Sequence, residues 1–142
     1  MKRIKIIFAL LALFAMSVAC HADGRIIPVD QLPAAAKAFI QQYFADKTPA
    51  YAEKEDGKYE VRFNDGTEVG FDRQGGWDKV DCRMAAVPAA LVPEAVSGYV
   101  EASFPGSVIV KIDKERYGFE IELSNDLELR FNKNGKLLSI DD

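Results

Sequence analysis

Apolar residues recur at two different spacings along the chain, and the same order of spacings occurs twice. Between residues 32 and 43 they lie three or four positions apart, and this spacing returns between residues 92 and 100. It places apolar side chains on one face of a helix. Pro33 and Pro93 fall where a first helical turn tolerates proline. The pattern predicts one amphipathic helix at the start of each stretch.

Strict alternation of apolar and polar residues follows each predicted helix. Residues 59–63 read Tyr-Glu-Val-Arg-Phe, and residues 119–123 read Phe-Glu-Ile-Glu-Leu. A period of two is typical of a strand with one buried face. Turn sequences such as Asp65-Gly66 separate these segments from further short strands. Each stretch therefore predicts a helix followed by four antiparallel strands.

The two stretches form an internal repeat. Residues 32–82 align without a gap onto residues 92–142, and ten of the 51 pairs are identical, against about three expected from average composition. Phe71 and Phe131 are one such pair, and we expect both to be core anchors. A unit of about 50 residues buries too little apolar surface to be stable alone.

These observations predict an α+β fold built as a tandem repeat. We expect one continuous antiparallel sheet of up to eight strands, with both helices on one face. Residues 23–142 would form a single domain of two repeats, 32–82 and 92–142, joined by a linker over residues 83–91.

The first 22 residues read as a secretory signal peptide. Three basic residues precede an apolar run over residues 6–19, which is shorter than the ~20 residues of a membrane span. Small residues allow cleavage after Ala19 or after Ala22. The predicted location is periplasmic or secreted, and the alternative is a lipoprotein anchored through Cys20. Either outcome leaves Cys82 without a disulfide partner, so we interpret it as a partly buried bystander thiol.

Charge and residue content exclude several classes of function. The 142 residues carry a net charge of −4, and the part after the signal peptide is more acidic still. Such a chain lacks the basic surface that binds nucleic acid. His21, in the cleavage region, is the only histidine, so no His-based catalytic set or zinc site is expected. We predict a protein that is not an enzyme, with no catalytic, cofactor-binding or metal-binding residues and no cofactor.

Several motifs of both repeats resemble the PepSY-like secreted proteins, also described as beta-lactamase-inhibitor-like. The matching segments are 32–40 (Leu-Pro-Ala-Ala-Ala-Lys-Ala-Phe-Ile), 65–72 (Asp-Gly-Thr-Glu-Val-Gly-Phe-Asp), 75–82 (Gly-Gly-Trp-Asp-Lys-Val-Asp-Cys), 119–123 and 131–135. The resemblance implies a secreted tandem of helix and sheet that is similar to the beta-lactamase inhibitor protein. It also suggests inhibitor or chaperone roles by analogy.

The strand alternation predicts a binding surface on the sheet face that points away from the helices. The residues expected there are Tyr51, Glu60, Arg62, Glu68, Trp77 and Lys79. Two aromatic side chains among charges suit a protein-binding surface. The alternative is a bulge after Gly75-Gly76 that turns Trp77 into the core.

The carboxylates of the same face are interpreted as cross-strand ion-pair partners of Arg62 and Arg130. The predicted function is a non-enzymatic module that binds an envelope or extracellular protein or peptide. The alternative function is a small-ligand carrier or sensor in the cell envelope. We expect neither a nucleic-acid partner nor a membrane span.

Overall fold

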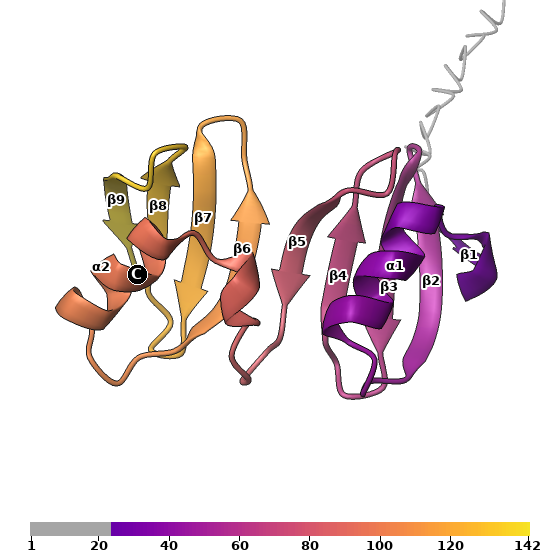
Figure 1. Ribbon diagram of the computed structural model, residues 1–142, viewed down its shortest axis with the longest axis horizontal. Helices are drawn as coiled ribbons and strands as arrows, with labels where there is room; N and C mark the ends of the chain where they lie inside the picture. Colours follow the sequence, from indigo (N-terminus) through magenta and orange to yellow (C-terminus); the bar gives the residue numbers. More distant parts are fainter. Residues whose placement is uncertain (1–23) are drawn as a thin grey trace, which may run out of the picture.

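The computed structural model describes residues 24–142, which form one nine-stranded antiparallel sheet and two α-helices (Figure 1). The predicted signal peptide, its cleavage sites and Cys20 lie outside these residues. The helices are α1 (Ala34–Tyr43) and α2 (Glu94–Ser103), and two single turns of 3-10 helix precede them, η1 (Val29–Gln31) and η2 (Ala89–Leu91). The strands are β1 (Arg25–Ile27), β2 (Pro49–Glu55), β3 (Lys58–Phe63), β4 (Glu68–Phe71), β5 (Trp77–Asp81), β6 (Ile109–Lys114), β7 (Gly118–Leu123), β8 (Glu128–Asn132) and β9 (Leu137–Asp141).

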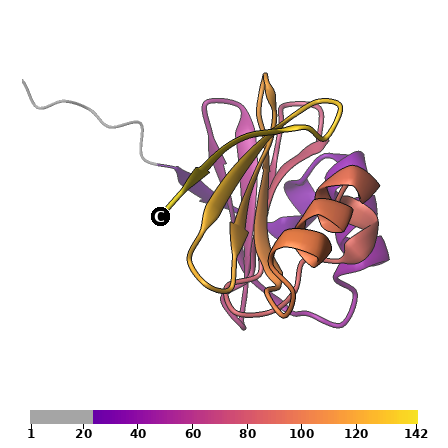
Figure 2. The ribbon, with the colours of Figure 1, turned by 90° about the vertical axis from the view of Figure 1, so that its left-hand side faces the viewer.

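The strands lie side by side in chain order, and both helices cover the same face of the sheet (Figure 2). No helix of residues 24–142 lies on the other face, as the side view shows. This confirms the predicted fold class, the continuous sheet and the placement of the helices. Over residues 24–142, neither helix has the length and hydrophobicity that a membrane span requires.

One strand more than predicted is present, because β1 pairs with β2 in front of the first repeat. Ile27 lies opposite Ala52, just as Val80 of β5 lies opposite Ile112 of β6. Ala52 and Ile112 are equivalent in the repeat, so β1 covers β2 in the way that β5 covers β6. Ile27 is buried there. Three residues before a proline are too few to show an alternating pattern, which is why the sequence did not reveal this strand.

The repeat also begins earlier than the predicted boundaries. The turns η1 and η2 are equivalent at the same offset of 60 residues as the helices and the strands. Residues 89–91, which we predicted as part of the linker, therefore belong to the second repeat. The connection between the repeats is correspondingly shorter than the predicted segment 83–91.

Phe71 and Phe131 are fully buried beneath the helices at equivalent positions. The ring of Phe39 meets that of Phe71 edge-on at 5.7 Å between centroids, and Tyr99 meets Phe131 in the same way at 5.6 Å. The prediction that these two phenylalanines are equivalent core anchors is confirmed. The two phenylalanines pack the helices against one face of the sheet, so the opposite face is not used for this packing.

Candidate functional site: the uncovered sheet face

Glu68 is the centre of a charged cluster on the uncovered face of the first repeat. It is only 5% exposed, and its Oε1 accepts from Arg62 and from Arg83, the latter at 2.7 Å. Its Oε2 accepts from Lys79 Nζ at 3.2 Å. Burial opposes ionisation of this carboxyl group, but the neighbouring cations outweigh that effect and lower the pKa of Glu68. We call these four residues the Glu68 cluster.

Two more predicted residues extend the Glu68 cluster across the sheet. Lys79 Nζ lies 3.5 Å from Glu60, and the guanidinium carbon of Arg62 lies 5.9 Å from the centroid of the Tyr51 ring. Burial disfavours the charge on Lys79, but Glu60 and Glu68 raise its pKa above the usual value. Five of the six predicted surface residues are therefore brought together. Arg83 joins them from the loop after β5, which strand alternation could not indicate.

The sixth residue, Trp77, is on the other side of the sheet, and its predicted exposure on the uncovered face is wrong. The pairing of β4 with β5 changes register, so that Gly70 lies opposite Lys79 whereas Phe71 lies opposite Trp77. Asp78 is the extra residue of this irregularity. The indole consequently packs against Phe39, with stacked rings 6.0 Å apart. The alternative that turned Trp77 toward the core is the correct one.

In the second repeat an arginine occupies the middle of the uncovered face. Arg130 Nε donates to Glu120 at 2.9 Å, and one of its terminal nitrogens donates to Glu128 at 2.7 Å. The pairs of Arg130 with Glu120 and of Arg62 with Glu68 confirm two of the predicted cross-strand ion pairs. Glu128 instead lies on the same strand as Arg130, and Glu60 pairs with Lys79. The equivalent of Arg130 in the first repeat is Gly70, which contributes no side chain.

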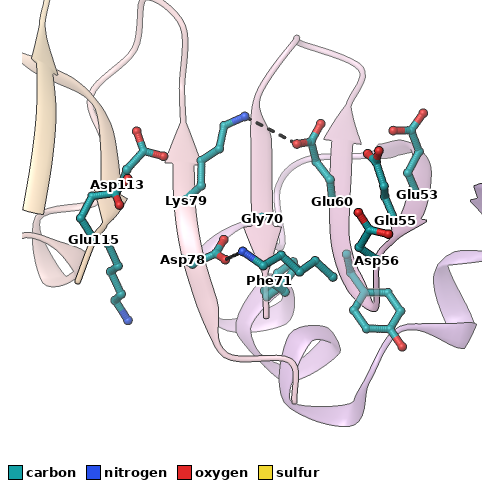
Figure 3. Close-up of a pocket in the computed structure, with 13 residues that line it drawn as sticks. Glu53, Glu55, Asp56, Glu60, Gly70, Phe71, Asp78, Lys79, Asp113 and Glu115 are labelled. Carbon is teal, nitrogen blue, oxygen red and sulfur yellow. Dashed lines mark ion pairs between the residues drawn. The ribbon is translucent and has the colours of Figure 1, made fainter. Parts of the chain in front are cut away.

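A groove of about 560 Å³ opens where that side chain is missing (Figure 3). A Cβ atom on Gly70 would lie only 2.8 Å from an Asp78 carboxylate oxygen and 3.2 Å from Lys79 Cβ, so side chains of β5 lie close over this glycine in the floor of the groove. Strands of both repeats contribute, from β2 to β6. The lining residues are Glu53, Glu55, Asp56, Lys58, Tyr59, Glu60, Gly70, Phe71, Asp78, Lys79, Asp113, Lys114 and Glu115.

The groove is strongly acidic. Seven of its lining residues are Asp or Glu and three are Lys, and each lysine has a local partner. Lys79 contacts Glu60, Lys58 Nζ lies 3.8 Å from Asp78, and Lys114 lies over the Trp77 ring. Sequence reasoning missed this acidic groove, because its carboxylates come from two repeats and from turns outside the alternating segments.

Within residues 24–142, Cys82 and Asp72, the candidates for reactive chemistry, have surroundings that do not favour catalysis. Cys82 is buried, and burial raises the pKa of its thiol, which disfavours the nucleophilic thiolate. The carboxylate of Asp72 accepts from the backbone of Gln74 and Gly76, as in an ordinary turn. Among residues 24–142 no three His, Cys, Asp or Glu side chains are grouped so that they could hold a metal ion.

Comparison with known proteins agrees with the tandem architecture. A family described as "Putative beta-lactamase-inhibitor-like, PepSY-like" matches residues 16–62 and 57–139. The chain belongs to this PepSY-like family. The resemblance seen in the sequence motifs is thereby confirmed. No curated protein matches the chain.

Solved structures of Bacteroides proteins share this PepSY-like fold. A "putative calcium-regulated periplasmic protein" of Bacteroides thetaiotaomicron is 38% identical, with a TM-score of 0.81, and the match covers 84% of this chain and 98% of that one. A "putative periplasmic protein of unknown function" of Bacteroides vulgatus is 34% identical, with a TM-score of 0.79 and coverage of 84% and 99%. A second Bacteroides vulgatus periplasmic protein, of the DUF2874 family, is 35% identical, with a TM-score of 0.81 and coverage of 86% and 99%.

Proposed function

We propose that this PepSY-like protein is a non-enzymatic periplasmic module that binds a positively charged polypeptide segment in the acidic groove. The observation that carries the proposal is the groove itself. It is open to solvent on a sheet face that no helix covers, and acidic residues outnumber lysines by four along its walls.

The charges of the groove favour an extended, basic partner. Glu55 and Asp56 are exposed at its rim, and Glu53 is half-buried beside them. Lysine or arginine side chains of a bound segment would pair with these rim carboxylates without first breaking an ion pair. Complementary potentials steer association and determine which partners are rejected.

The floor of the groove supports the same proposal. Because Gly70 has no side chain, the Asp78 carboxylate lies close over β4 and adds a negative charge to the floor of the groove, where a bound basic side chain would meet it. In the second repeat Arg130 fills the equivalent position and pairs with its own neighbours. The first repeat is therefore the one we propose to bind.

The periplasmic location rests on the relatives. Three solved relatives that are 34–38% identical are described as periplasmic proteins, and the predicted signal peptide is consistent with export. We propose no metal site, because the described residues offer no suitable group of ligands, although the Bacteroides thetaiotaomicron relative is described as calcium-regulated.

A direct binding measurement tests the proposal. The probe is a fluorescently labelled octapeptide of alternating lysine and serine, and its counterpart alternates glutamate and serine. We expect the lysine peptide alone to bind, and the affinity to fall with added salt. The double change Glu53→Gln and Glu55→Gln should weaken binding about 5- to 10-fold, as expected for losing two partly solvated charge pairs.

The matched control removes the same charge from the helix side of the molecule. Glu94 and Glu101 are exposed on α2, and the double change Glu94→Gln and Glu101→Gln should leave the affinity unchanged. Equal weakening by both double variants would show that binding follows net charge alone. Equal binding of the two peptides would contradict the proposal.

A further inference from the structure

The equivalent residues Val80 and Ile140 differ greatly in exposure. Val80 on β5 is fully buried, whereas Ile140 on β9 is 43% exposed. Both lie on the helix-covered side, opposite Val69 and Leu129 respectively. Their strands occupy the same place in the two repeats, so the difference reflects what lies beyond each strand.

The outer edge of β5 is covered by the second repeat. Lys79, Val80 and Asp81 pair with Asp113, Ile112 and Lys111 of β6. The amide of Cys82 donates to the carbonyl of Val110 at 2.8 Å, which shows that this edge satisfies its backbone groups through β6. Val87 and Leu91 of the following segment are buried, and the amide of Val87 donates to the carbonyl of Ile109 at 2.9 Å.

The outer edge of β9 has no such cover within residues 24–142, where the sheet ends at β9. By equivalence with Val80 and Cys82, the backbone groups of Ile140 and Asp142 point outward from this edge. Leu138 on the same strand is 54% exposed. An edge strand with unpaired backbone groups and exposed aliphatic side chains is a template for another strand.

The two ends of the sheet differ in how they are protected. The strand β1 is only three residues long and is followed directly by Pro28. In contrast, β9 has five residues and contains neither lysine nor proline, the residues that commonly block pairing at sheet edges. The pairing of β8 with β9 has a bulge at Leu138, but β5 has the equivalent bulge at Asp78 and still pairs with β6 from Lys79 onward. The part of β9 after Leu138 is therefore able to pair.

We propose that the outer edge of β9 is a second binding site, which takes an extended polypeptide strand of a partner by antiparallel β-addition. The pairing of β5 with β6 indicates the chemistry of that strand. An aliphatic residue would lie opposite Ile140, as Ile112 lies opposite Val80. A basic residue would lie opposite Asp141, as Lys111 lies opposite Asp81.

Charge complementarity supports this choice of partner. Asp141 and the neighbouring Asp142 are both exposed at the edge. A strand that alternates aliphatic and basic residues would place a basic residue opposite Asp141, whose carboxylate lies 3.7 Å from Arg130, while covering Ile140. Main-chain hydrogen bonds would supply affinity, and the alternate side chains would supply specificity. This site is separate from the acidic groove and does not depend on it.

The experiment uses the strand that covers β5 as its probe. A peptide with the sequence of residues 108–115 (Val-Ile-Val-Lys-Ile-Asp-Lys-Glu) is added to the wild-type protein. Affinity is measured by fluorescence anisotropy, and the binding site is located by amide hydrogen exchange. We expect the amides of Ile140 and Asp142 to become protected, because they would donate to the added strand.

Two peptides with methylated backbone nitrogens distinguish binding by strand pairing from binding by nonspecific attraction. Methylating the backbone nitrogens that correspond to Val110 and Ile112 removes donors that would face β9, and should weaken binding at least about 10-fold. Methylating those of Lys111 and Asp113, which face away, adds the same bulk and should cost much less. Both methylated peptides are tested on the wild-type protein, so this comparison does not depend on the folding of a variant.

Three outcomes would overturn the proposal. The first is equal weakening by the two methylated peptides. The second is protection around Gly70 rather than at β9, with binding lost in the variant Glu53→Gln and Glu55→Gln, because the peptide would then occupy the groove. The third is a protein dimer whose β9 amides are already protected without peptide, which would identify a second copy as the occupant.

Discussion

The ammonium group of Lys114 lies 3.8 Å from the centroid of the Trp77 ring, so a cation of the second repeat covers the indole of the first. Burial lowers the pKa of Lys114, and Asp72 and Asp78 only partly offset this. The indole also packs against Phe39 of α1. One side chain thus contacts the first helix and the seam between the two repeats.

This contact predicts the fluorescence of the protein, whose only tryptophan is Trp77. The emission of the free protein should be blue-shifted and partly shielded from a soluble quencher. Lys114→Ala should shift the emission to the red and cost about 0.5–1 kcal/mol, the size of an exposed cation–π contact. Lys133→Ala, at an exposed turn of the second repeat, is the control and should change neither. A wild-type spectrum like that of tryptophan in water would contradict the placement of the indole.

Because Phe71 and Phe131 are equivalent in the core, we expect their replacement by alanine to lower the free energy of unfolding equally. Phe71 and Phe131 are both fully buried, so Phe71→Ala and Phe131→Ala should each lower the free energy of unfolding by about 3–5 kcal/mol. Chemical denaturation followed by circular dichroism measures this. Tyr117→Ala removes a partly exposed aromatic ring and should cost much less. If both phenylalanine changes cost under about 1 kcal/mol, the strand faces described above are wrong.

The shared sheet predicts that both repeats unfold together. Val80 and Ile112 are fully buried opposite each other across the seam, so loss of one repeat would expose the core of the other. Thermal unfolding followed by Trp77 fluorescence, which reports the first repeat, should coincide with unfolding followed by circular dichroism.

A destabilising variant in the second repeat tests directly whether the first repeat unfolds with it. Leu129→Ala, a buried change in β8, should lower both midpoints by the same amount. A Trp77 transition that stays at the wild-type temperature would show that the repeats unfold independently.

The fold could be predicted because the apolar periodicity of its helices and strands occurs twice along the sequence. Each helix and strand of the repeat was indicated by the spacing of its apolar residues. The identical residues Phe71 and Phe131 showed that the strands of both repeats have the same register. What the pattern did not contain was local irregularity. A single extra residue, Asp78, reverses the side of the sheet on which Trp77 lies, and strict alternation has no means of signalling it.

The candidate site was predictable only in part, for a related reason. Tyr51, Arg62 and Glu68 lie on alternating segments, so their common face could be read from the sequence. The acidic groove instead depends on pairing across the seam, which brings Asp113 and Glu115 of the second repeat into the same groove as Glu60. Residues that meet through long-range pairing share no local pattern.

Glu68 predicts a pH-dependent contribution to the stability of the protein. Burial tends to raise the pKa of Glu68, but Lys79, Arg62 and Arg83 lower it below the ordinary 4.5. The folded protein therefore holds this carboxylate ionised more strongly than the unfolded chain does. The resulting stabilisation is fully present above the unfolded pKa and is lost as the pH falls through the lower, folded pKa.

The variant Glu68→Gln removes that charge without changing the shape of the side chain. At pH 7 it should lower the free energy of unfolding by about 1.5–3 kcal/mol, the range for hydrogen bonds to a charged group. The difference from wild type should shrink as the pH falls below 4.5, because the wild-type carboxyl group then also becomes neutral. Urea denaturation at a series of pH values measures the two curves.

Glu128→Gln is the matched control for this prediction. The side chain of Glu128 is 38% exposed, and Arg130 is its ion-pair partner, so its loss should cost at most about 1 kcal/mol at pH 7. The two variants differ in the burial of the carboxylate and in the number of cations around it. If their curves run parallel to each other at every pH, the Glu68 cluster contributes no more than an ordinary surface ion pair.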